Sequence, residues 1–170
     1  MEKNTNQSEL EQQARKWLAD RGVGLDDIAE LVFYLQSKYH DELKMEDCRY
    51  NVERVLTKRE VQNAILTGIQ LDVLAEQQKL DQPLQKTIDT DESLYGIDEV
   101  IALSIVNVYG SIGMTNYGYI DKQKPGILKR LNDKSSGEVH TFLDDIVGAI
   151  AAAASSRLAH ATADDALLDD

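Results

Sequence analysis

Apolar residues recur every three or four positions along most of the chain, which is the spacing of one face of an α-helix. This periodicity predicts a chain built almost entirely of helices. The longer helices are expected at residues 8–21, 26–39, 45–56, 57–78, 91–110 and 146–160. Short helices are expected near residue 88 and just after Pro125, because proline fits the first turn of a helix.

The last of these helices differs from the others in composition. It carries Gly148 and a run of four alanines, so neighbouring helices can approach its backbone closely. We therefore predict an all-α fold, a compact multi-helix bundle around this alanine-rich helix. Residues 1–163 are expected to form the single domain, and residues 164–170 an acidic tail.

Composition supports one helical domain. The 170 residues are 42% hydrophobic and only 6% aromatic, with two prolines. Cys48 is the single cysteine, which excludes an internal disulfide and suits a reducing cytoplasm. Because no window approaches the roughly 20 apolar residues of a membrane span, we expect a soluble protein, at most peripheral to the inner face of the cell membrane.

The charge of the chain is unevenly distributed. A net charge of −12 argues against a nucleic-acid partner, which would require a basic surface. Residues 119–134 nevertheless carry a local charge of +3, with five cations, Lys122, Lys124, Lys129, Arg130 and Lys134, against Asp121 and Asp133. Such a basic island can attract a phosphate group or an anionic membrane, although a solvated helix face would have the same composition.

Reactive side chains concentrate in the second half of the chain. Two carboxylate pairs, Asp98-Glu99 and Asp144-Asp145, each stand at the predicted start of an apolar helix. Between them, Asp121 precedes Lys124-Pro125 by three residues. Carboxylate oxygens beside an ammonium group suit a Mg²⁺ ion held by protein on one side and by a substrate phosphate on the other.

Two other patterns resemble phosphate sites. The glycine-rich stretch 110–118 is predicted to be a loop whose N–H groups could meet a phosphate, although it lacks the P-loop pattern. Cys48 and Arg54 have the C-x₅-R spacing of cysteine-dependent phosphatases. The interval has no glycine and continues an amphipathic helix, which favours a packed core thiol.

Taken together, three ordered motifs resemble the phosphatidylglycerophosphatase A family: Asp98-Glu99 entering an apolar helix, Asp121-x-x-Lys124-Pro125, and Asp144-Asp145-Ile146-x-x-Ala149. The resemblance implies a Mg²⁺-dependent phosphatase of phospholipid biosynthesis that converts phosphatidylglycerophosphate to phosphatidylglycerol and phosphate. Better-known members are membrane-embedded, whereas this chain is similar to a soluble branch labelled low temperature requirement C. Asn132 stands where the family pattern suggests another carboxylate.

The resulting hypothesis gives each site residue a role. Glu99, Asp121 and Asp145 would bind Mg²⁺, and Lys124 would bind the phosphate. Asp98 and Asp144 would either support the metal ligands or position the water that attacks the phosphomonoester in line. The competing interpretation is a non-catalytic, self-associating binding or regulatory protein of the same fold, in which the carboxylates only cap helices. The apolar helices favour a homo-oligomer in either case.

Overall fold

The computed structural model describes residues 2–168, and the side chains of residues 9–161. Over this range it contains helices and no strand, which confirms the all-α prediction. The α-helices are α1 (Glu2–Asp20), α2 (Leu25–Gln36), α3 (Met45–Leu56), α4 (Arg59–Glu76), α5 (Leu84–Asp89), α6 (Ile97–Val106), α7 (Ser111–Gln123), α8 (Ile127–Leu131) and α9 (Leu143–Leu168). Two short 3₁₀ helices, η1 (Asn107–Tyr109) and η2 (Lys134–Ser136), precede α7 and α9.

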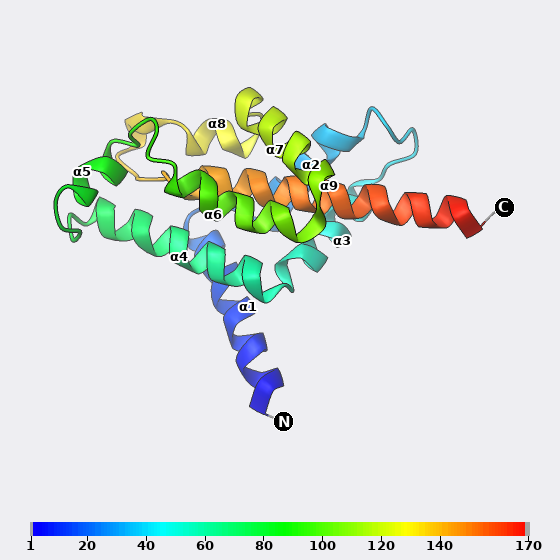
Figure 1. Cartoon of the computed structure of the whole chain (residues 1–170), viewed down its shortest axis with the longest axis horizontal. Coiled ribbons are helices and arrows are strands. Elements are labelled where there is room, and N and C mark those ends of the chain that lie inside the picture. The colour runs from blue at the N-terminus through cyan, green and yellow to red at the C-terminus, as the bar shows by residue number, and fades with distance from the viewer. Residues whose placement is uncertain (1, 169–170) are drawn as a thin grey trace.

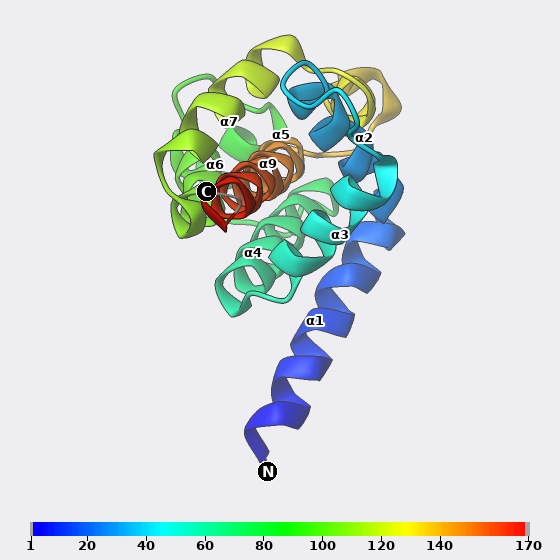
Figure 2. The same ribbon diagram turned by 90° about the vertical axis from the view of Figure 1, so that its right-hand side faces the viewer.

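Helix α9 is the axis of the fold. Seen end-on it lies in the middle of the other helices (Figure 2), and it contacts α2, α3, α4, α6, α7 and α8. Its alanine run is fully buried, so the neighbouring helices pack directly against a narrow helix surface. The prediction of a central alanine-rich helix is therefore confirmed. Helix α1 reaches away from this group at its N-terminal end (Figure 1).

The start of α9 packs tightly against α4. A Cβ atom added at Gly68 of α4 would collide with the side chain of Ile146 and lie 3.0 Å from the Cβ of Phe142. Glycine is therefore needed at this crossing for steric reasons. The crossing fixes where the first turn of α9 lies relative to α4.

An ionic network holds the segment that leads into α9. Arg21, just after α1, places Nη1 2.9 Å from Glu76 Oε2 and donates from Nη2 to the carbonyl of Val139 at 2.9 Å. Glu76 Oε1 in turn accepts the N–H of Val139 at 3.1 Å. Partial burial alone would raise the pKa of Glu76, but the pairing with Arg21 leaves it below its usual value. The ends of α1 and α4 thus position the chain just before α9.

Several helix bounds in the structure differ from the predicted ones. The first helix begins at Glu2 instead of residue 8, since nothing in residues 2–8 interrupts a helix. The helix expected from residue 91 begins at Ile97, because Gly96 takes the left-handed conformation at φ 80°. Residues 164–168, assigned to the tail, continue α9.

The glycine-rich stretch at 110–118 is not a loop. Residues 111–123 form α7, so the loop predicted as a phosphate contact does not exist. Burial of Tyr117 and Ile120 stabilises this helix in spite of its glycines. Gly113 lies close to Val106 and Ser156, with an added Cβ 3.0 Å from Val106 Cγ1. This glycine serves helix packing.

Candidate active site at the start of helix α9

The first turn of α9 is capped by a residue from another helix. Asp72 of α4 is fully buried, and its carboxylate accepts the N–H of Phe142 at 3.0 Å and that of Leu143 at 3.0 Å. Burial raises the pKa of Asp72 well above its usual value, against the effect of these two N–H donors. The hydroxyl of Thr141, just before α9, does not cap the helix and donates to the carbonyl of Ile88 at 2.6 Å. Asp144 is therefore not needed as the cap of its own helix.

Asp144 and Asp145 are buried at this helix start, with 7% and 6% of their surfaces exposed. Asp144 Oδ1 accepts the N–H of Asp145 at 2.8 Å, and its Oδ2 accepts from Lys124 Nζ at 3.1 Å. The same ammonium group donates to Asp121 Oδ1 at 2.6 Å. Lys124 thus joins the end of α7 to the start of α9.

The backbone of Lys124 adopts an unusual conformation at this point. Its φ of 47° lies in the left-handed region, which few residues other than glycine adopt. Burial alone would lower the pKa of Lys124, but the carboxylates of Asp144 and Asp121 raise it above its usual value. The ammonium group therefore stays charged between its two partners.

The two buried aspartates are strained electrostatically. Burial raises the pKa of Asp144 to about 6, although Lys124 opposes the rise. The pKa of Asp145 rises to about 10, because of burial and then the negative charges of Asp144, Asp98 and Asp121. One lysine does not compensate this accumulation of negative charge.

The charges of Asp98, Asp121 and Asp144 all raise the pKa of Asp145, whereas Glu99 affects the pKa of Tyr117. Asp98, half-buried, and Glu99, exposed, lie in the first turn of α6. The charge of Asp98 helps to raise the pKa of Asp145. The charge of Glu99 helps to raise the pKa of the buried Tyr117 phenol. We call Asp98, Glu99, Asp121, Asp144 and Asp145 the acidic cluster. Its members come from the starts of α6 and α9 and the end of α7.

The acidic cluster has donor atoms suited to Mg²⁺. Among the described side chains, no three His, Cys, Asp or Glu residues converge closely enough to hold a metal ion by themselves. Mg²⁺, however, is usually bound by one or two carboxylates together with waters and substrate phosphates, so a dedicated protein cage is not required. The hard carboxylate oxygens and the excess negative charge around Asp145 fit such an ion.

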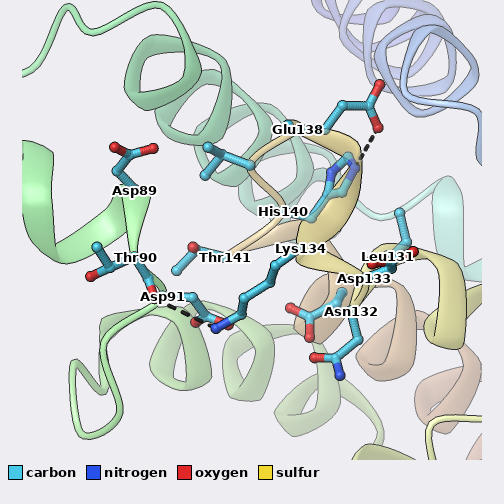
Figure 3. A pocket seen from close by; sticks show the side chains of 13 residues that line it. Asp89, Thr90, Asp91, Leu131, Asn132, Asp133, Lys134, Glu138, His140 and Thr141 are labelled. Carbon is cyan, nitrogen blue, oxygen red and sulfur yellow. Dashed lines mark hydrogen bonds and ion pairs between the residues drawn. The ribbon is translucent and has the colours of Figure 1, made fainter.

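A polar pocket of about 170 Å³ adjoins the cluster (Figure 3). It lies between the residues after α5 and the connection from α8 to α9, and Asp144 forms part of its wall. Exposed Asp133 and Lys134 also line it, so the pocket wall contains both buried and exposed charged residues. Asn132, at the position where another carboxylate was expected, also lines it.

The basic island predicted at residues 119–134 is dispersed in the fold. Lys124 faces the acidic cluster, whereas Arg130 donates to the carbonyls of Arg21 and Gly22 at 3.2 and 2.9 Å. Lys134 Nζ lies 3.6 Å from Asp91 Oδ2. The island therefore contributes one cation, Lys124, to the cluster. Arg130 and Lys134 instead contact other parts of the fold.

The cysteine motif has no catalytic environment. Cys48 is fully buried within α3, and burial followed by the charge of Asp47 raises the pKa of its thiol to about 11. A reactive cysteine requires the opposite shift, toward the thiolate. The interpretation of Cys48 as a core thiol is confirmed.

The comparisons with known proteins agree over nearly the whole chain. The family model described as phosphatidylglycerophosphatase A matches residues 16–160. The uncharacterized protein YutG of Bacillus subtilis (strain 168) is 71% identical over 160 residues, which cover 94% of this chain and 96% of that protein. Two solved structures are similar. A protein of unknown function from Bacillus stearothermophilus is 74% identical, with a TM-score of 0.88 over 89% of this chain and 94% of that one. The low temperature requirement C protein from Listeria monocytogenes is 70% identical, with a TM-score of 0.89 over 90% of this chain and 96% of that one.

Proposed function

The chain belongs to the phosphatidylglycerophosphatase A family, and from this premise we propose that it is a Mg²⁺-dependent phosphomonoester hydrolase acting at the acidic cluster. The observation that carries the proposal is the convergence of three separate acidic segments on the environment of Asp145 and Tyr117, with Lys124 in contact with two of the acids. Phosphatidylglycerophosphate is the substrate that family membership favours, and phosphatidylglycerol and phosphate would be the products.

The residues divide between metal and phosphate. Glu99, Asp121 and Asp145 would hold Mg²⁺, which when bound neutralises charge on the phosphoryl oxygens. Lys124 would bind the phosphate as a point charge, exchanging one of its two present carboxylate partners for a phosphate oxygen. Its raised pKa keeps it cationic at the pH of the cytoplasm.

Asp144 is suited to act on the attacking water. Its two carboxylate oxygens are oriented by the N–H of Asp145 and by Lys124, and each retains a lone pair for a further hydrogen bond. A pKa of about 6 lies near the pH at which a general base works best. The polar pocket beside it would admit water, and Asp98 would help to position that water from the α6 side.

Exposed apolar side chains beside the cluster favour a lipid substrate over a soluble one. Ile97 and Val100, on either side of Asp98 and Glu99, are 49% and 58% exposed. Leu94, in the turn before α6, is fully exposed. None of the helices in the described part of the chain is long and apolar enough to cross a bilayer. The protein would therefore reach a lipid phosphate from the membrane surface, by peripheral contact.

The direct test is phosphate release from phosphomonoesters with and without acyl chains, measured with Mg²⁺ and with EDTA. We expect hydrolysis only with Mg²⁺, and its loss in Asp145→Asn and Lys124→Ala. Lys129→Ala, which removes an exposed lysine from the same stretch of chain, is the matched control and should keep full activity. Activity that persists in EDTA, or in both site variants, would remove the assignment.

A second candidate is a self-associating binding or regulatory protein without catalysis. The absence of a three-ligand metal group among the described side chains, together with exposed Ile112 and Met114 on α7, favours it. Thermal melting distinguishes the two functions, because a ligand that binds only the folded state raises its melting temperature. A melting temperature unchanged by Mg²⁺, in a protein whose oligomers dissociate on Ile112→Ser substitution, would support this candidate.

A further inference from the structure

The side chain of Tyr117 is buried next to the acidic cluster and its hydroxyl is unused. Only 7% of the residue is exposed. Among the described residues its hydroxyl oxygen has no hydrogen-bond partner. Buried polar atoms in folded proteins are nearly always paired, so an unpaired hydroxyl at this position requires an explanation.

The ring of Tyr117 lies one helical turn behind the acids on two helices. On α7 it precedes Asp121 by four residues, so both side chains are on the same face. On α9 it packs over Gly148, where an added Cβ would be 3.8 Å from Tyr117 Cε2. Gly148 follows Asp144 and Asp145 by about one turn. The phenol is therefore anchored in the wall from which the acids project.

The charged surroundings of Tyr117 are all acidic. Burial, followed by the negative charges of Asp145, Asp121, Asp144 and Glu99, raises the pKa of its phenol above its usual value. The hydroxyl therefore keeps its proton and remains a donor. It makes no hydrogen bond to any of these carboxylates, although each could accept one.

A phosphate at this site would need neutral donors. Lys124 contributes one cation, whereas five carboxylates repel an anion. The N–H groups of Phe142 and Leu143 at the start of α9, which could otherwise bind phosphate, are taken by Asp72. A protonated phenol supplies a hydrogen bond without adding to the negative charge.

We propose that the Tyr117 hydroxyl donates a hydrogen bond to a phosphoryl oxygen of the substrate bound at the acidic cluster. This assignment rests on the proposed phosphatase function. It makes Tyr117 a phosphate-binding residue of that site, supplied from the middle of α7.

Tyr117→Phe keeps the ring and removes only the hydroxyl, and Tyr109→Phe is its matched control. Tyr109 also has a buried hydroxyl without a partner, but its charged neighbours are Arg157, Arg54 and Glu60. The variants are melted with Mg²⁺ over a range of inorganic phosphate, and KM and kcat are measured with a phosphomonoester. We expect Tyr117→Phe to weaken phosphate binding and raise KM about 10- to 100-fold, and Tyr109→Phe to change neither.

The melting temperature without phosphate provides the remaining check. A hydroxyl that is unpaired in the free protein stabilises nothing, so Tyr117→Phe should melt at or above the wild-type temperature. If the wild type is active, the assignment would be overturned by a Tyr117→Phe variant that melts at a lower temperature than the wild type or binds phosphate equally well. Either result would leave the phosphatase function intact. A wild type that neither hydrolyses phosphomonoesters nor responds to phosphate would overturn both.

Discussion

Helices α3 and α9 both begin with two acids, and the two pairs have different environments. In α3, exposed Asp47 folds back to accept the N–H of Lys44 at 3.2 Å, which is ordinary capping. In α9, Asp144 and Asp145 are buried and Asp72 provides the cap from outside the helix. Two acids at a helix start therefore cap the helix where they face solvent, as in α3. In α9 another residue supplies the cap, so the carboxylates of the two acids are not needed for capping.

The largest expected difference between the two pairs is in activity. Asp145→Asn should lower kcat/KM for a phosphomonoester by at least about 100-fold, since it removes a proposed ligand of the metal that would stabilise the transition state. Asp47→Asn should stay within about twofold of wild type, a margin well below 1 kcal/mol. Steady-state kinetics of both variants at saturating Mg²⁺ measure the effect. Equal activities would mean that the two acidic pairs are equivalent.

The second difference concerns the cap. Asp72→Ala should lower the free energy of unfolding by about 3 kcal/mol, because it removes the cap and leaves two buried N–H groups without an acceptor. Asp47→Ala removes an exposed contact and should cost about 1 kcal/mol or less. Urea denaturation followed by circular dichroism gives both values. Similar losses would show that α9 does not depend on Asp72.

The third difference is the response to metal. With Mg²⁺ at about 100 times its dissociation constant, a single site on the folded state adds about 2.7 kcal/mol of stability. The wild type and Asp47→Asn should show this gain, and Asp145→Asn should lose most of it. Thermal melting over a Mg²⁺ series is the measurement, with K⁺ at equal ionic strength as the control. A gain of the same size in all three proteins would place the ion elsewhere.

The smallest expected effect is on pH dependence. Burial lowers the pKa of His140, just before α9, with Arg21 and Arg130 acting in the same direction and Glu138 against it. The unfolded chain therefore takes up a proton near pH 6.5 that the folded chain takes up only at lower pH. This contribution to stability is full above pH 6.5 and is lost as the pH falls toward the folded-state pKa. His140→Gln should consequently lose less stability than wild type between pH 7 and pH 5, as measured by urea denaturation.

The helices, the acids and Lys124 could be predicted from the sequence, but the contacts made by distant segments could not. Periodicity was sufficient for α3, whose bounds were predicted at residues 45–56, and for the central position of α9. It failed at α7, where tertiary burial stabilises a glycine-containing helix that local propensity disfavours. Local pattern also gave no indication of the cap of α9, because that cap comes from a residue 70 positions earlier.

Asp72 and Tyr117 are buried neighbours of the acidic cluster that the sequence did not reveal. Asp72 is a charged residue on the buried face of α4, three residues after Ile69, and this interruption of an apolar face is the only local signal of its role. Tyr117 lies in the stretch that the glycines predicted as a loop, so no local pattern indicated its burial. Its relation to the acids arises only from the packing of α7 against α9.

The contact between Asp72 and Phe142 joins parts of the chain separated by 70 residues. A collapsed intermediate with intact helices but with α4 undocked would show a nearly native far-ultraviolet spectrum and would still lack an ordered pair at Asp144 and Asp145. During refolding, recovery of the proposed phosphatase activity should therefore lag behind recovery of helicity. Turnover would then report the completion of long-range assembly, which spectroscopic helix content does not.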